Sequence, residues 1–449
     1  KKINIKETNS KTLYREYSLQ IPYDEIDNLI NNKIKELIPT VTMPGFRKGK
    51  APLNIVKKKY ESNILSEVMQ TIVQERTKKL LDEKKLKPFR QPRVDIKKYE
   101  KNQPVEIDIK IDLEPEIQLK KFKDLKLNKY EIKLDKKIID ENYNNFLLSQ
   151  KNYQKIASKR SIKNSDKIII NLESKDKSVP EFIRSQKNLP IISDSDFQIL
   201  PNIIERIIEK KAFIGDKFSL TFDISKILKS ENVKEVLFDI EIVSVEEQIP
   251  FNITEDFLKK NGFKNELELK ENLKQSVESK YKNGINQIEK KQLMDILDAE
   301  HKFDLPQGII DEEFHEIWHR LEHAKKDNTL DEDDKNLSDE KLKERYKLIA
   351  NRRVKLAILL QFIAKEENIS VSEKELTDGM QHYASQYPGQ EKQIFEYFKK
   401  NPTSIESVRG PILEQKVIDS IVSKSDSKMT KLSVNEYKTL EEKTFSVSK

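Results

Sequence analysis

The sequence predicts a multidomain α+β protein with an α+β domain, a β-rich module and an elongated all-α region. Three observations support this class. The chain of 449 residues is too long for one compact core. Strand-like runs of apolar and polar residues are concentrated before Phe251. From Phe251 onward, apolar residues recur at spacings of three and four, which is typical of helices.

The first domain, residues 1–113, is predicted to place two helices on a small sheet. "INIKETNSKTLYREYSLQIP" predicts two strands and a turn, and "RVDIKKYE" and "PVEIDIKIDLEP" predict two more strands. Apolar residues at helical spacing predict one helix over 26–37 and a longer one over 53–85. Prolines end the first helix, so a tip rich in glycine and cations, "TMPGFRKGKAP" (42–52), connects the two.

The remaining segments are assigned by the same patterns. Residues 114–158 are predicted to form a linker with a strand, "LKLNKYEIKL", and the first helix of the all-α region. Residues 159–248 are predicted to form a β-rich module with strands in "DKIIINLES", "KFSLTFDI" and "EVLFDIEIVSVEE" and a helix in "LPNIIERI". Residues 249–430 are predicted to be helical apart from an acidic, polar loop at 326–340, and residues 431–449 are predicted to be a poorly ordered tail.

The net charge of +7 is unevenly distributed along the chain. Residues 1–110 hold 25 Lys and Arg against 15 Asp and Glu, a net of +10, and the rest hold 59 against 62, a net of −3. The basic excess therefore lies in the first domain, which suggests that this domain contacts RNA or another acidic surface. Scattered, solvated lysines are the alternative interpretation.

The composition also excludes several kinds of site. With no cysteine, these residues can form no disulfide, no cysteine-ligated zinc site and no thiol nucleophile. The longest apolar run, "VKLAILLQFIA" (354–364), is shorter than the roughly 18 residues of a membrane span, so we expect no membrane contact. The charged opening "KKINIKETNSK" lacks the apolar stretch of a secretory signal, so we expect a cytoplasmic protein.

One motif in the helical region matches a zinc site. "HEIWH", His315–His319, has the spacing in which two histidines bind zinc and Glu316 is the general base of a metalloprotease. His323 continues the row, but the outer histidines lie about 12 Å apart by helix rise, so a third ligand would have to come from elsewhere. We therefore expect no metal and no other cofactor, with the histidines on a solvated face and Ile317 and Trp318 packed inward.

The tip at 42–52 differs from an ordinary helix connection. Its two glycines permit backbone angles that a β-carbon forbids, and the flanking prolines brace its ends. Cations bind RNA phosphates and an exposed aromatic ring stacks or enters a pocket, so the tip suits a surface that mixes RNA with protein. The residues predicted to be exposed there are Phe46, Arg47, Lys48 and Lys50.

The stretch "GFRKGKAPLNIVKKKY" resembles the signature of the bacterial trigger factor family, which are ribosome-associated chaperones. "ITEDFLKKNGFKNELELKENLK" also resembles the family where its helical domain resumes after an insertion, and the domain order agrees over the full length. The resemblance implies a ribosome-binding N-terminal domain, an inserted FKBP-like peptidyl-prolyl isomerase domain and a helical domain that cradles clients. It implies that the docking tip consists of Gly45, Phe46, Arg47, Lys48, Gly49 and Lys50.

The function implied by the resemblance is that of an ATP-independent chaperone. Its partners would be the large ribosomal subunit near the exit tunnel, through both protein and rRNA, and nascent unfolded polypeptides; a weak homodimer off the ribosome is left open. Two alternatives remain from the residues alone. A basic domain also suits an RNA-binding ribosome-assembly factor without clients, and "HEIWH" suits a zinc metalloprotease.

The resemblance further implies an isomerase pocket, but the sequence departs from the family there. Such a site has no nucleophile: apolar walls desolvate the X-Pro amide and favour its twisted form, lowering a barrier of about 18–20 kcal/mol. The family's I-P-G-F-like turn is "LPNI" here, with Asn202 in place of glycine, and a glycine-rich turn has become "ESKDKSVPEF". We therefore expect reduced or absent activity. The candidate pocket walls are Leu172, Phe182, Leu200, Ile203 and Phe238.

Overall fold

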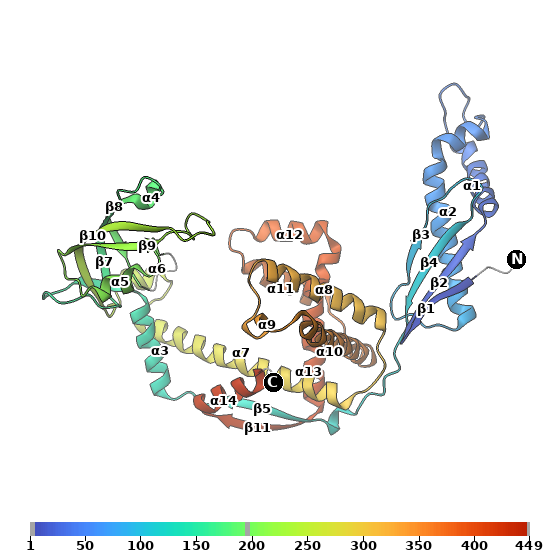
Figure 1. Cartoon of the computed structure of the whole chain (residues 1–449). Coiled ribbons are helices and arrows are strands. Elements are labelled where there is room, and N and C mark those ends of the chain that lie inside the picture. The colour runs from blue at the N-terminus through green and yellow to red at the C-terminus, as the bar shows by residue number, and fades with distance from the viewer. Residues whose placement is uncertain (1–4, 194–197, 447–449) are drawn as a thin grey trace. The chain divides into compact units, whose positions relative to one another are not determined.

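The computed structural model describes residues 5–193 and 198–446. The chain divides into two compact units of two segments each: Lys1–Lys129 with Gln287–Thr430, and Tyr130–Asn286 with Lys431–Lys449. Strands and helices occur in both units, and the described residues after Phe251 are almost entirely helical (Figure 1). The multidomain α+β class with a long helical region is therefore confirmed.

The N-terminal part of the first unit is an antiparallel sheet with two helices on one face (Figure 1). The strand order is β1-β2-β4-β3. The elements are β1 (Ile5–Lys11), β2 (Tyr14–Ile21), α1 (Tyr23–Leu37), α2 (Leu53–Lys84), β3 (Arg93–Ile96) and β4 (Val105–Asp112). Every second residue of β4 points into the core, because successive side chains of a strand alternate between its faces. These buried residues are Val105, Ile107, Ile109 and Ile111.

Both helices bury an apolar stripe against that sheet, as predicted from their spacing. The buried stripe of α1 is Ile26, Ile30 and Ile34. The buried stripe of α2 includes Val56, Ile64, Val68 and Ile72. Since α2 has 32 residues, it extends for about 48 Å, and its first turn lies directly after the glycine-containing tip.

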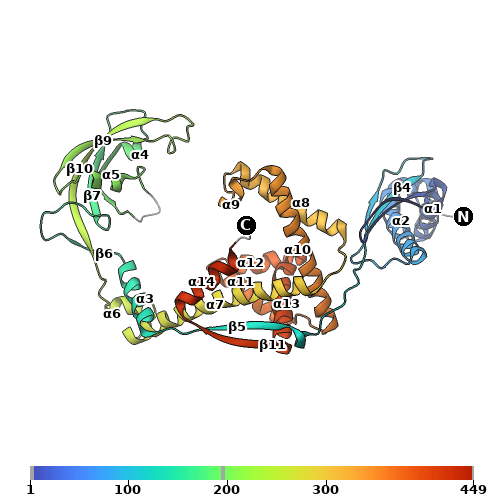
Figure 2. The same cartoon turned by 60° about the horizontal axis from the view of Figure 1, so that its bottom comes forward.

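The second unit contains the β-rich module, whose antiparallel sheet has the order β6-β10-β7-β8, with β9 also paired to β10. The elements are β6 (Asn152–Lys155), β7 (Lys167–Glu173), α4 (Glu181–Arg184), β8 (Ser185–Ile191), α5 (Ile203–Glu209), β9 (Lys217–Asp223) and β10 (Glu235–Ile249). Helix α5 packs on the sheet (Figure 2) and buries Ile203, Ile204 and Ile207 in its core. Strand β8 was not predicted, because its sequence "SQKNLPI" has little apolar alternation and only pairing with β7 makes it a strand.

The remaining helices follow the predicted pattern. In the second unit they are α3 (Lys136–Ser149), α6 (Glu255–Lys260) and the first part of α7 (Glu266–Glu300). The first unit contains the end of α7 together with α8 (Gln307–Lys326), α9 (Glu332–Lys335), α10 (Asp339–Glu366), α11 (Glu373–Ser385), α12 (Glu391–Lys400) and α13 (Glu406–Lys424).

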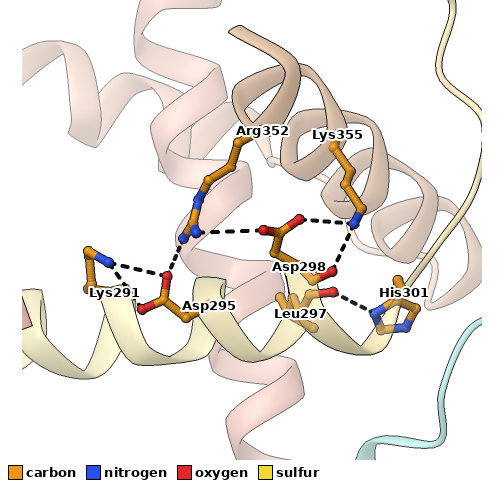
Figure 3. Close-up of polar contacts among 7 residues, drawn as sticks. All are labelled: Lys291, Asp295, Leu297, Asp298, His301, Arg352 and Lys355. Atoms are coloured by element: carbon orange, nitrogen blue, oxygen red, sulfur yellow. Dashed lines mark hydrogen bonds and ion pairs between the residues drawn. The ribbon is translucent and has the colours of Figure 1, made fainter. Parts of the chain in front are cut away.

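Polar contacts join the end of α7 to α10 in the first unit (Figure 3). The Asp298 carboxylate forms an ion pair with Lys355 at 2.9 Å, and the Asp295 carboxylate forms one with Arg352. His301 is buried; its Nε2 accepts the Lys120 backbone N–H at 3.1 Å, so Nδ1 donates to the Leu297 carbonyl at 2.9 Å. The imidazole therefore satisfies one backbone carbonyl at the end of α7 and one backbone N–H of the segment that precedes β5.

The tail and the acidic loop differ from their predictions. The described part of residues 431–449 is not poorly ordered, because β11 (Asp426–Leu432) pairs with β5 (Lys126–Ile132) and α14 (Val434–Phe445) follows. Tyr437 of α14 is buried and contacts the Tyr281 ring at 5.3 Å between centroids. The segment at 326–340 is not a loop throughout, since it contains the short helix α9 (Glu332–Lys335), whose Asp334 is 2% exposed and pairs with Arg345 at 2.8 Å.

Candidate functional site

The tip at 42–52 is a closed, double-turn connection between α1 and α2. The Phe46 N–H donates to the Met43 carbonyl at 3.1 Å, and the Lys50 N–H donates to the Arg47 carbonyl at 2.9 Å. The Gly49 N–H donates to the Val41 carbonyl at 3.3 Å and closes the base. These backbone bonds fix the position of the segment between Met43 and Lys50.

The two glycines are required by the backbone of these turns. Gly45 has φ = 82° and Gly49 has φ = 76°. Residues with a β-carbon rarely adopt this left-handed region, because the β-carbon clashes with the backbone there. At Gly49 a β-carbon would also lie 3.2 Å from the Pro39 carbonyl oxygen, whereas at Gly45 it would meet open space. The backbone geometry therefore accounts for the glycines, with the tighter position at Gly49.

The tip separates buried anchors from exposed side chains. Val41, Met43 and Ala51 are buried in the core of the N-terminal domain. Phe46 is 37% exposed, although Met43 only three residues earlier is 8% exposed. A folded domain gains little by leaving a phenylalanine at its surface, and the exposed part of the ring is available for contact with a partner.

The charged side chains of the tip are available to such a partner. Arg47, Lys48 and Lys50 are exposed, and the structure, over the residues it describes, gives none of them an ion pair with a carboxylate. Guanidinium and ammonium groups bind phosphate oxygens, arginine through two parallel hydrogen bonds and lysine as a point charge. The predicted docking residues thus lie together on one loop, with an apolar ring and three exposed cations.

The candidate isomerase residues are not brought together at a surface. Leu172, Leu200, Ile203 and Phe238 belong to one core cluster and are at most 1% exposed. Phe182 is 58% exposed on α4 and lies outside that cluster. A side chain without accessible area cannot contact a peptide, so these four residues act as core in this conformation.

The turn before α5 has a left-handed backbone of the kind that glycine favours, although asparagine stands at this position. Asn202 has φ = 53° and ψ = 32°, and asparagine is the residue after glycine that best tolerates this left-handed region. One turn later, the Arg206 guanidinium lies 4.6 Å from the centre of the Phe222 ring. Phe222 in turn contacts Phe238 edge to face at 6.0 Å between centroids. An arginine therefore covers an aromatic ring of the module.

The "HEIWH" motif lies on α8 with its histidines in solvent. His315, Glu316 and His319 are exposed, whereas Ile317 is buried and Trp318 is half-buried against Phe314 at 6.0 Å between ring centroids. The predicted orientation of this helix is confirmed. Within the described residues, no group of three or more His, Asp or Glu side chains is placed to hold a metal ion.

An aromatic patch on α11 and α12 was not singled out from the sequence. Tyr383 and Tyr387 contact each other at 5.5 Å between ring centroids, and Tyr383 and Tyr397 both contact the buried Phe398. The signal that could have found it is the pair of tyrosines four residues apart, followed by "IFEYF". We define the α11–α12 aromatic patch by its exposed members, Tyr383, Tyr387, Phe395 and Tyr397.

Among the residues with described positions, no helix is long and apolar enough to cross a membrane.

Comparisons with known proteins agree over nearly the whole chain. The family model described as bacterial trigger factor protein matches residues 3–146, and that described as its C-terminus matches residues 267–423. The trigger factor of Gluconacetobacter diazotrophicus is 31% identical over 426 residues, 94% of this chain and 95% of the relative. The trigger factors of Gluconobacter oxydans (30% identical, 93% and 95% covered) and Rhodospirillum centenum (28%, 94% and 94%) are similar over the same extent.

A solved structure described as the trigger factor chaperone aligns over 94% of this chain and 99% of that chain, at 18% identity and a TM-score of 0.47. The sequence matches favour neither a metalloprotease nor an RNA-binding assembly factor without clients. Shared sequence over more than nine-tenths of both chains shows that this chain belongs to the trigger factor family.

Proposed function

We propose that this protein is an ATP-independent chaperone that docks on the large ribosomal subunit beside the exit tunnel and shields nascent polypeptides. The observation that carries the proposal is the tip, where an exposed Phe46 stands among three cations that have no carboxylate partner among the described residues. Because translating ribosomes are in the cytoplasm, the proposal includes a cytoplasmic location for this protein. The tip is the only part of the proposal that requires a particular arrangement of a few residues.

The tip binds its partner through two kinds of contact. Arg47, Lys48 and Lys50 bind rRNA phosphates, and Phe46 inserts into an apolar pocket of a ribosomal protein. The hydrogen-bonded turns fix the backbone of the tip before docking, so little backbone freedom is lost when the complex forms. An aromatic ring next to an arginine is the composition that dominates binding at many protein interfaces.

The helical part of the first unit holds the clients. The α11–α12 aromatic patch exposes tyrosine and phenylalanine rings among charged residues, which suits weak contacts with many different apolar segments. Such contacts need no ATP, since a client leaves when its own core buries those segments more favourably. We propose the domain bounds 1–113 for docking, 114–158 and 249–430 for client binding, and 159–248 for the inserted module.

The inserted module keeps the FKBP-like place in the chain with reduced or absent isomerase activity. The trigger factor family carries a peptidyl-prolyl isomerase domain, but four of the five candidate walls here are buried in the core. Buried walls cannot desolvate an X-Pro amide, so these four residues do not lower its isomerisation barrier in the described structure. A protease-coupled assay on a Phe-Pro peptide tests this, and turnover typical of the family would refute it.

The docking proposal is tested by co-sedimentation of the full chain with ribosomes. Replacing Phe46, Arg47 and Lys48 with alanine should weaken binding by at least about tenfold, because an aromatic anchor and two charge contacts are lost. Unchanged binding at about 0.15 M salt would contradict the proposal.

A further inference from the structure

We propose that the RNA-contacting surface continues beyond the tip onto the outer face of α2, through Lys58, Lys59 and Ile55, with Lys35 at the end of α1. The partner of this extension is the sugar-phosphate backbone of RNA. The inference rests on the proposed docking function, because it assigns a partner to the surface beside the same tip.

The charge of the chain is concentrated at this end of the N-terminal domain. Between Lys35 and Tyr60 the sequence has seven lysines and arginines and one acidic residue, Glu36, a net of +6. The same 26 residues therefore carry most of the +10 excess of residues 1–110. The first turn of α2 contains no acidic residue, so the positive end of the helix dipole adds to this field.

Ion pairs divide the lysines of this domain into two groups. Lys57 binds Asp27 at 2.7 Å and Asn31 at 3.0 Å, and Lys33 binds Glu67 at 2.9 Å. These contacts join α1 to α2 and neutralise the cations that make them. Lys58 and Lys59 follow directly in sequence, yet within the described chain neither they nor Lys35 has an ion pair with a carboxylate.

Helix geometry explains the division. Val56 and Tyr60 face the core, and at 100° per residue Lys57 is turned to the side that carries α1. Lys58 then points away from the core, and Lys59 lies on the opposite flank from Lys57. Ile55 is on the same outer face and is 39% exposed. The Lys59 ammonium lies 5.4 Å from the centre of the Tyr60 ring, and in the described structure neither lysine has a carboxylate partner. An apolar side chain beside two such lysines continues the composition of the tip.

The chemistry of this face favours RNA over an acidic protein. Lys58 and Lys59 lie about 8 Å along α2 from its start, so with the tip they form an extended line of point charges. A nucleic acid strand repeats its charge every few ångströms, about 3.4 Å in B-DNA, and can meet such a line at several points. Lysines recognise phosphate charge without bidentate geometry, which suits a contact that is independent of base sequence.

The test measures binding of the full chain to a fluorescein-labelled RNA duplex of about 20 base pairs by anisotropy, between about 50 and 200 mM salt. Lys58→Gln/Lys59→Gln should weaken binding about fivefold or more and reduce the slope of log K against log salt by about one to two. Lys58→Arg/Lys59→Arg retains both charges and should bind RNA as tightly as the unaltered protein does. Lys78→Gln/Lys79→Gln is the matched control, because it removes two adjacent exposed lysines further along the same helix.

Two results would overturn the inference. One is equal RNA affinity and salt slope for the Lys58/Lys59 and Lys78/Lys79 glutamine variants. The other is that polyglutamate of equal charge displaces the protein as well as unlabelled RNA does, which would indicate an acidic protein partner. Failure of the docking proposal is separate, since it is decided by ribosome binding of the Phe46/Arg47/Lys48 variant, and the RNA measurement does not depend on that result.

Discussion

The tip at 42–52 and the inserted module at 159–248 place their aromatic side chains in opposite environments. Phe46 is 37% exposed on a loop whose backbone is fixed by hydrogen bonds, whereas Phe238 has no exposed surface in the core of a sheet. Both positions were candidate functional residues by their sequence. The difference shows that access to solvent, rather than residue type, separates a side chain that is able to contact a partner from one that only packs in the core.

The two regions also differ in how closely their residues follow the pattern of the family. At the tip, the signature residues are present and the structure exposes those that can contact a partner. In the module, Asn202 replaces a glycine and the apolar positions are closed into the core. We expect the first region to retain its binding role and the second to contribute mainly a folded domain.

The largest expected effect is the difference in unfolding free energy lost when Phe238 or Phe46 is replaced by alanine. Phe238→Ala should lower the local free energy of unfolding of the module by about 3–5 kcal/mol, because it removes a buried ring and leaves a cavity. Phe46→Ala should change that of the N-terminal domain by less than about 1 kcal/mol. Hydrogen exchange of the β10 amides and of the α2 amides in the full chain measures the two values. Similar losses of unfolding free energy in both variants would contradict the claim that Phe238 is a core residue and Phe46 is not.

Within the tip, the two glycines should differ. Gly49→Ala should destabilise the N-terminal domain by about 2 kcal/mol, because both the left-handed backbone and the approach to the Pro39 carbonyl oppose a β-carbon. Gly45→Ala should cost about 1 kcal/mol, since only the backbone opposes it. Hydrogen exchange of α1 and α2 reports both. A larger loss for Gly45→Ala than for Gly49→Ala would contradict the geometry of the tip.

The module should be sensitive to acid at the connection between β9 and β10. Hydrogen bonds from the backbone and hydroxyl of Ser225, and from the Lys234 backbone, hold the pKa of Asp223 below its ordinary value of 3.8. The ionised carboxylate therefore stabilises the fold above that value, and the stabilisation is lost as pH falls through the lower pKa of the folded state.

Asp223→Asn should thus lower the melting temperature at neutral pH and flatten its fall between about pH 5 and 3, measured by circular dichroism. Glu235→Gln is the matched control, since in the described structure the Glu235 side chain makes no hydrogen bond or ion pair. An equal change of acid sensitivity in both variants would exclude Asp223 as the cause.

The smallest expected effect is that of Asn202→Gly. Glycine relieves the left-handed backbone of this turn but gains freedom in the unfolded chain, so stability should change by less than about 1 kcal/mol. Isomerase turnover should not rise, because the candidate walls stay buried. A protease-coupled assay on a Phe-Pro peptide measures this. Turnover typical of the family in the variant alone would mean that the missing glycine, rather than the buried walls, limits activity.

Local patterns allowed much of the fold to be predicted. The stripes of α1 and α2, the strands of the N-terminal sheet and the turn-forming glycines all depend on residues close in sequence. The exposed state of Phe46 also followed, because the glycines and prolines around it exclude a helix or strand. The docking residues could therefore be placed on one loop from the sequence.

Features that depend on distant partners could not be predicted. Strand β8 forms through pairing with β7, and the described tail is ordered because β11 pairs with β5 and Tyr437 packs on α7. In the module, alternation identifies two faces of each strand without indicating which face is covered, so buried walls looked like pocket walls. Asp334 of α9 is buried against Arg345, which lies 11 residues later on α10.

The central claim is that the tip, through Phe46 and its neighbouring cations, is what holds this protein on the ribosome. The most direct test compares two triple alanine variants of equal composition by co-sedimentation with ribosomes at about 0.15 M salt. One removes Phe46, Arg47 and Lys48; the other removes Phe182, Arg184 and Lys187, which include a phenylalanine of the module that is even more exposed than Phe46, at 58% against 37%. We predict that the first variant loses ribosome binding by at least about tenfold and that the second binds as the unaltered protein does. Equal binding by both variants would contradict the account.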